Sequence, residues 1–147
     1  MRAVIQRVKK AKVKIINSNE ERSIGNGLLV FLAIHSEDSY ETIKWFANKI
    51  VNLRVFPDNA NKMNLSVQDV KGKLMIISNF TLYGDVSRGF RPNFMFSANP
   101  EFAKTLYEQF VDYLQRNFQV PVVSGEFGAM MEIELTNDGP VTLIIDK

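Results

Sequence analysis

The stretch Lys73–Tyr83, KLMIISNFTLY, contains the clearest change of character in the chain. Four consecutive apolar residues, Leu74–Ile77, lead directly into the polar side chains of Ser78, Asn79 and Thr81. A short, uninterrupted aliphatic run of this kind is typical of a strand that is covered on both faces, although a short buried helix fits the same run. The stretch therefore predicts a buried strand that ends in a group of polar residues.

The polar end of this strand has two interpretations. If the chain stays extended, Ser78 and Phe80 share one face and Asn79 and Thr81 share the other, so hydroxyl groups lie on both sides of a core element. In the first interpretation the hydroxyls cap local backbone groups where the strand frays. In the second they form a polar pocket at the strand end.

The composition indicates one folded, cytosolic domain. The chain has 147 residues, of which 46% are hydrophobic, and its 18 basic and 16 acidic residues leave a net charge of +2. Any affinity for nucleic acid must therefore come from the local placement of charge. Cysteine is absent, which excludes thiol catalysis, and the single histidine, His35, follows an apolar run and is expected at a strand end. No segment has the length or apolarity of a membrane span.

The first half of the chain predicts antiparallel strands followed by a helix. Alternating apolar residues over positions 3–15 slip in register around Arg7–Lys10, which indicates either one long strand with a bulge or two strands. A short returning strand at 22–25 and a buried strand at 27–34 follow. The helix is expected over about 39–53, with Asp38 and Glu41 as a capping box.

The second half predicts another helix and a hairpin. Asn99 is the expected cap and Pro100 the first residue of a helix that ends near Asn117. Alternation at 131–135 and 141–145 around Asn137–Pro140 predicts a hairpin in which Gly139 and Pro140 turn the chain.

A basic and aromatic loop separates the central strand from the second helix. It reads GDVSRGFRPNFMFSANP and sets Arg88 and Arg91 among Phe90, Phe94 and Phe96. Arginine beside aromatic residues is the composition that binds phosphates and stacks on bases. Phenylalanines also anchor long loops to a core. Both interpretations remain open on the residues alone.

Five segments together carry a resemblance to a known family. They are MRAVIQRV at 1–8, KMNLSV at 62–67, SNFTLY at 78–83, SGEFGAMM at 124–131 and NDGPVT at 137–142. In this order they resemble the D-aminoacyl-tRNA deacylases over essentially the whole chain. Asn79 stands where the family usually has glutamine, Met130 where aspartate is common, and Arg88 where lysine is common.

The resemblance implies a fold and an activity. The implied fold is mixed α/β, a single domain over residues 1–147 with a largely antiparallel sheet forming a barrel-like core and two main helices. The implied activity is hydrolysis of the ester between a D-amino acid, or glycine, and the 3′ end of tRNA. It implies a cytoplasmic homodimer with active sites at the subunit interface, a cis Gly139–Pro140 peptide that enters the partner's pocket, and no cofactor, metal or membrane.

The resemblance also implies roles for individual residues. Backbone donors near Phe80 and Thr81 polarise the ester carbonyl, Phe127 and Met131 pack the terminal adenine, and Arg7 supports the Gly-Pro carbonyls. The implied catalytic residues are Ser78, Asn79, Phe80 and Thr81; those for substrate binding are Gly139, Pro140, Phe127, Met131 and Arg7; those for tRNA are Arg88 and Arg91.

Two alternatives fit the departures at Asn79 and Met130. One is a non-catalytic RNA-binding dimer that retains the fold, and the other is an enzyme that hydrolyses a different aminoacyl or acyl ester. Binding of RNA without hydrolysis distinguishes the first alternative from the deacylase.

Overall fold

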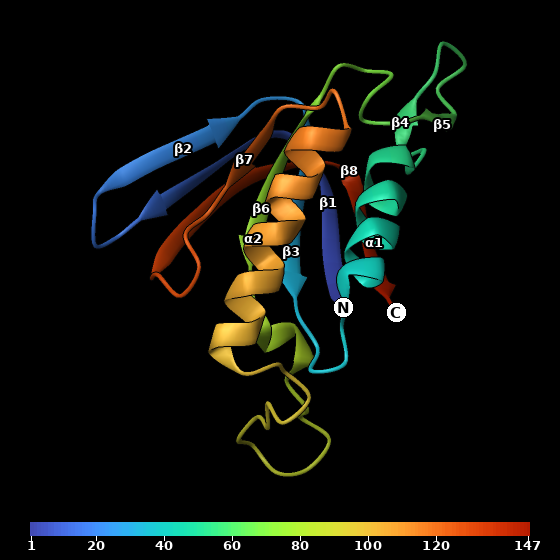
Figure 1. Cartoon of the computed structure of the whole chain (residues 1–147). Coiled ribbons are helices and arrows are strands. Elements are labelled where there is room, and N and C mark those ends of the chain that lie inside the picture. Colours follow the sequence, from blue (N-terminus) through green and yellow to red (C-terminus); the bar gives the residue numbers. More distant parts are fainter.

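Strand β1 (Arg2–Ile15) lies at the centre of the sheet in the computed structural model, which describes residues 1–147. One edge of β1 pairs antiparallel first with β3 (Gly27–Ala33) and then with β2 (Glu20–Ile24). Its other edge pairs antiparallel with β8 (Met131–Asp146) along almost its whole length. Figure 1 shows this arrangement, with β1 between the early strands and the last strand.

A bulge divides β1 into two halves that face different cores. The register with β8 shifts between Gln6 and Val8 and again between Val8 and Lys10. Before the bulge, Ala3 and Ile5 face the helices, whereas Val8, Ala11 and Val13 enter a second apolar cluster on the other side of the sheet. The predicted register slip is therefore confirmed, and it lies within one continuous strand because β8 pairs with both halves.

The central strand is β6 (Lys73–Ser78), which is parallel to β3 on one side and to β7 (Val122–Ser124) on the other. Leu74 and Ile76 pack under the helices, and Met75 and Ile77 belong to the second cluster. Met131 and Ile133 of β8 pack against that same cluster, so the sheet curls into a nearly closed barrel. The prediction of a strand buried on both faces is confirmed.

Two helices cover one face of the sheet, and their N-termini test the predicted caps. Helix α1 (Tyr40–Asn52) is capped by Ser39 and Thr42, so the predicted cap of Asp38 with Glu41 is wrong. Asp38 instead accepts a hydrogen bond from the N–H of His35 and pairs with the N-terminal ammonium group. Helix α2 (Pro100–Asn117) begins as predicted, with the Asn99 side chain accepting from the N–H of Phe102 at 3.0 Å.

The predicted C-terminal hairpin is wrong. Residues 131–146 form one strand, β8, and Asn137 pairs with Val8 while Thr142 pairs with Gln6. The four residues between them make an irregularity opposite Arg7 rather than a turn. Gly139 and Pro140 thus lie in the middle of a strand because β1 offers a partner on both sides of them.

The remaining elements are short. Strands β4 (Phe56–Pro57) and β5 (Met63–Leu65) form a two-stranded sheet after α1, and the 3₁₀-helix η1 (Phe80–Tyr83) follows β6. The loop from η1 to α2 projects beyond the body of the molecule in Figure 1. The mixed α/β class with a largely antiparallel, barrel-like sheet and two helices is confirmed. Neither helix combines the length and hydropathy that crossing a bilayer requires.

Candidate active site

A cavity of about 540 Å³ opens where β6 ends. Its walls come from the end of β3, the start of η1, the loop before α2, the first residues of α2 and the turn before β8; the lining residues are 32–34, 78–80, 94, 97, 98, 100, 103 and 127–131. None of these side chains is charged, and only Ser78, Asn79 and Ser97 are polar. The cavity is therefore an apolar pocket with a small polar edge, the usual form of a ligand site.

The polar edge forms because the sheet stops at Ser78. The N–H of Asn79 donates to the carbonyl of Leu32 at 2.8 Å, and the chain then turns into η1. The chain therefore does not stay extended beyond Ser78, and the alternation of faces that an extended chain would give does not apply there. The N–H groups of Phe80 and Thr81 begin η1 and donate to no group of the protein. Two unpaired backbone donors thus stand beside the cavity.

Thr81 is placed differently from the other residues of its motif. Its exposed side chain does not line the cavity, and its hydroxyl donates to the amide oxygen of Asn79 at 2.5 Å. An amide oxygen is not a base, so nothing here activates Thr81 as a nucleophile. Neither Ser78 nor Thr81 bonds a backbone group through its hydroxyl, so the capping interpretation is wrong.

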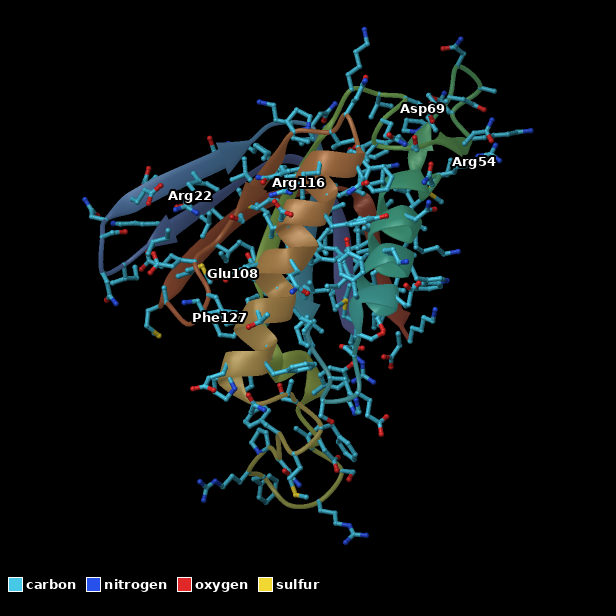
Figure 2. The ribbon with its side chains drawn as sticks, viewed as in Figure 1. Arg22, Arg54, Asp69, Glu108, Arg116 and Phe127 are labelled. Atoms are coloured by element: carbon cyan, nitrogen blue, oxygen red, sulfur yellow. The ribbon has the colours of Figure 1, made fainter.

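The opposite wall is the turn between β7 and β8. Phe127 lies beside α2, as Figure 2 shows, and its ring centroid is 5.9 Å from that of Tyr107. The Tyr107 hydroxyl donates to the carbonyl of Ile76 at 2.8 Å. Burial raises the pKa of Tyr107 well above its ordinary value, so this hydroxyl keeps its proton and its hydrogen bond to β6, and the ring that it fixes lies beside Phe127. Met130 and Met131 complete the wall, and Met130 is 72% exposed.

Phe94 is a wall residue that no single sequence motif identified. Its ring packs edge-on against Phe80, with centroids 5.1 Å apart, and it lines the cavity. Phe90, four residues earlier, is fully exposed. Phe94 therefore anchors the loop, as one interpretation expects, and Phe90 does not; the binding of phosphates or bases by the loop stays a prediction. Arg88 and Arg91 are exposed and lie outside the cavity.

Gly139 and Pro140 lie away from this cavity in the same chain. Both are exposed, and the peptide bond between them is cis. They stand opposite Arg7 on β1, whereas Ser78 pairs with Leu32 of β3. Strands β1 and β3 separate the two segments. On β3, Arg7 pairs with Leu28 and Ser78 pairs with Leu32. The Gly-Pro segment and Ser78 are therefore also offset by four residues, or about 13 Å, along the sheet.

Arg7 connects this segment to the helical layer. Its side chain is almost fully buried, and its Nε donates to the carbonyl of Asp138 at 2.9 Å. Its Nη1 donates to the carbonyl of Val55, just after α1, at 2.5 Å. Within the Gly-Pro segment, the carbonyl that Arg7 holds is thus that of Asp138, the residue before Gly139.

His35 is a strand-end residue, as expected. It forms an isolated bridge with Ser97, and its ring centroid is 5.4 Å from that of Tyr83. It does not line the cavity. No group of three or more histidine, cysteine, aspartate or glutamate side chains has the spacing to hold a metal ion.

Comparisons with known proteins point in one direction. The family described as D-Tyr-tRNA(Tyr) deacylase matches residues 4–146. A D-aminoacyl-tRNA deacylase of Thermosipho africanus is 52% identical over 150 residues, covering 100% of this chain and 97% of that protein. A protein of the same name from Fusobacterium nucleatum is 53% identical and covers 99% of this chain and 95% of its own length.

Two solved structures share the fold. One, described as a c-Myc DNA unwinding element binding protein, superposes with a TM-score of 0.92 at 35% identity, covering 100% of this chain and 99% of the other. A probable eukaryotic D-amino acid tRNA deacylase has a TM-score of 0.85 at 18% identity over 99% of this chain and 98% of its own, which is a likeness of fold. With a family match over nearly its whole length and relatives at about half identity, this chain belongs to the D-Tyr-tRNA(Tyr) deacylase family.

Proposed function

We propose that this protein hydrolyses the ester that joins a D-amino acid to the 3′-terminal ribose of tRNA, releasing free D-amino acid and tRNA. The observation that carries the proposal is the uncharged cavity with two unpaired backbone N–H groups beside it, that of Phe80, which lines the cavity, and that of Thr81, the next residue in the chain. An ester needs no strong acid for its cleavage, but its carbonyl oxygen becomes negative during attack. Preorganised N–H donors stabilise that oxyanion.

In the proposed mechanism, water attacks the ester carbonyl while the N–H groups of Phe80 and Thr81 hold its oxygen. The bond to the ribose oxygen then breaks, and that oxygen receives a proton. Because the cavity contains no carboxylate, imidazole or amine, the neighbouring ribose 2′-hydroxyl assists the proton transfer. Ser78 and Asn79 fix the ester by hydrogen bonds, and the apolar wall of Phe127 and Met131 packs the terminal adenine.

The active form in this proposal is a homodimer with each site at the interface. Strand β8 pairs only with β1, so its outer edge has no partner in the chain. The same strand carries exposed apolar side chains at Leu135, Leu143 and Ile144. Such an edge favours pairing with a second copy. The dimer then brings Gly139 and Pro140 of one subunit to the cavity of the other.

Chirality is read by exclusion in this arrangement. The carbonyls around Gly139 accept hydrogen bonds from the substrate's ammonium group, which fixes its α-carbon. An L side chain then points into the protein backbone and is excluded, whereas a D side chain points outward and does not contact the pocket. Glycine has no side chain to exclude, so glycyl-tRNA is also a substrate. This proofreading belongs to translation, and we place the protein in the cytoplasm.

One experiment tests the function directly. D-Tyrosyl-tRNA and L-tyrosyl-tRNA are incubated separately with the protein, and loss of each ester is followed against a sample without protein. We expect rapid loss of the D ester alone, and glycyl-tRNA in a parallel sample should also be hydrolysed. Equal stability of both tyrosyl esters with and without the protein would refute the activity.

A second candidate is a nucleic-acid-binding dimer without turnover. It is favoured by Asn79 and Met130, which depart from the family pattern, and by the description of one structural neighbour as a DNA unwinding element binding protein. This candidate predicts that uncharged tRNA binds while both tyrosyl esters persist.

A further inference from the structure

The loop between η1 and α2 is built to hold a small group of residues away from the protein. Asp85 and Asn93 form a bridge with two backbone hydrogen bonds, of 2.7 and 2.9 Å. The Asp85 carboxylate accepts from the N–H of Ser87 at 2.9 Å, and the Asn93 amide oxygen accepts from the N–H of Met95 at 3.0 Å. The base of the loop is therefore closed, and residues 88–91 form its tip.

The loop tip (residues 88–91) presents one aromatic ring between two cations. Phe90 is fully exposed, and Arg88 and Arg91 form no ion pair. Gly89 has a φ of +67°, which lets the chain turn sharply between Arg88 and Phe90. An exposed phenylalanine gains nothing from folding, because its ring remains in water. A ligand with an apolar face and negative charge would cover the ring and pair with both arginines.

The tip is continuous with the cavity. Phe94, four residues after Phe90, lies both against Phe80 and in the cavity wall. Four residues of extended chain span at most about 14 Å. A ligand that enters the cavity by its terminal residue therefore passes within reach of the tip by its next few residues. In the proposed substrate those residues are the unpaired nucleotides that precede the terminal adenosine.

We propose that the loop tip binds the single-stranded 3′ end of tRNA outside the cavity, with Phe90 stacking on a base before the terminal adenosine and Arg88 and Arg91 pairing with phosphates. Stacking on an aromatic ring with arginine at the backbone is how proteins hold unpaired RNA. This inference rests on the proposed function for the identity of its ligand. It assigns Phe90 a part in binding that the cavity itself does not supply.

The test compares two substrates that differ only beyond the terminal adenosine. Phe90→Ala is assayed on D-tyrosyl-tRNA and on adenosine carrying the same D-tyrosyl ester. We expect kcat/KM for the tRNA to fall about 5-fold to 100-fold, mainly through KM, and to stay unchanged for the adenosine ester. Phe90→Trp should retain activity on both. Met95→Ala, which removes an exposed apolar side chain outside the bridge, is the matched control and should change neither.

The arginines have a separate readout in salt dependence. Arg88→Ala and Arg91→Ala should each reduce the slope of log kcat/KM for the tRNA against log salt by about 0.7. Arg116→Ala removes the same charge near the far end of α2, as Figure 2 shows, and should leave the slope unchanged.

Binding of uncharged RNA separates failure of this inference from failure of the proposed function. In a Trp45→Phe background, Phe90→Trp fluorescence should be quenched by the trinucleotide cytidylyl-cytidylyl-adenosine but not by adenosine. That result supports the inference even if neither ester is hydrolysed. An absent quench overturns the inference. So does a Phe90→Ala variant that loses activity equally on both substrates, or on neither. Dissociation of a dimer by Phe90→Ala, seen by sedimentation, would also overturn it.

Discussion

The end of β6 carries the Ser78–Thr81 motif and the middle of β8 carries the Gly139–Pro140 motif. The two motifs differ in how far the rest of the chain encloses them. The end of β6 is enclosed, because five other segments of the same chain complete the cavity around Ser78 and Asn79. The middle of β8 is presented outward, because Gly139 and Pro140 are exposed and the cavity of their own chain does not include them. One motif is thus enclosed by segments of its own chain, and the other is exposed on the surface of that chain.

The largest effect is expected from placing a side chain at the outward motif. Gly139 has a φ of +144°, and a Cβ there would lie 2.7 Å from the backbone nitrogen of Val141. Gly139→Val should therefore displace the segment, cost about 1 to 3 kcal/mol of stability, and reduce D-tyrosyl-tRNA hydrolysis by at least about 100-fold. Single-turnover assays and denaturant unfolding measure the two effects. Gly25→Val, where a Cβ meets nothing within 4 Å, is the control and should be nearly silent.

Arg7→Met tests whether the position of Gly139 and Pro140 depends on the hydrogen bond from Arg7 to the carbonyl of Asp138. The change removes the donors to the carbonyls of Asp138 and Val55 while keeping an apolar stem. We expect a loss of about 2 to 4 kcal/mol in unfolding free energy, because one buried and one partly buried carbonyl lose a charged donor. Activity should fall about 10-fold to 100-fold by displacement of Gly139. Lys12→Met, which removes only exposed ion pairs on the same strand, should cost at most about 1 kcal/mol.

Thr81→Ala tests the enclosed motif at its edge. Since the Thr81 hydroxyl bonds only the amide oxygen of Asn79, its loss should leave measurable activity, reduced by at most about 10-fold to 100-fold. Complete inactivity, or an acyl group trapped on Thr81 of the native protein, would show that the threonine is a nucleophile. Mass spectrometry of the enzyme quenched during turnover distinguishes these outcomes.

No effect is expected from a chelator. The residues lining the cavity offer no carboxylate, imidazole or thiolate to a metal ion. Turnover after dialysis against EDTA should therefore equal that of the untreated protein. If activity were lost and then restored by added Zn²⁺ or Mg²⁺, residues outside the cavity lining would have to bind a catalytic metal ion.

The sequence predicted the enclosed motif better than the outward one for a physical reason. A buried run such as Leu74–Ile77 shows its environment in its own composition, and the helix cap at Asn99 is equally local. The position of Gly139 and Pro140 in the sheet depends on Val8 and Gln6, more than 130 residues earlier, so local turn preference predicts a false hairpin. Phe94 was ambiguous for the same reason, because its partner Phe80 lies across a loop.

The pairing of β1 with β8 also sets the order in which this protein is able to fold. During synthesis β1 emerges first, and β2 and β3 cover one of its edges soon afterwards. Its other edge has no partner until residues 131–146 have been made. Such distant pairing slows folding and leaves an open strand edge exposed in the meantime. The nascent chain therefore carries a central strand with one unpaired edge through most of its translation.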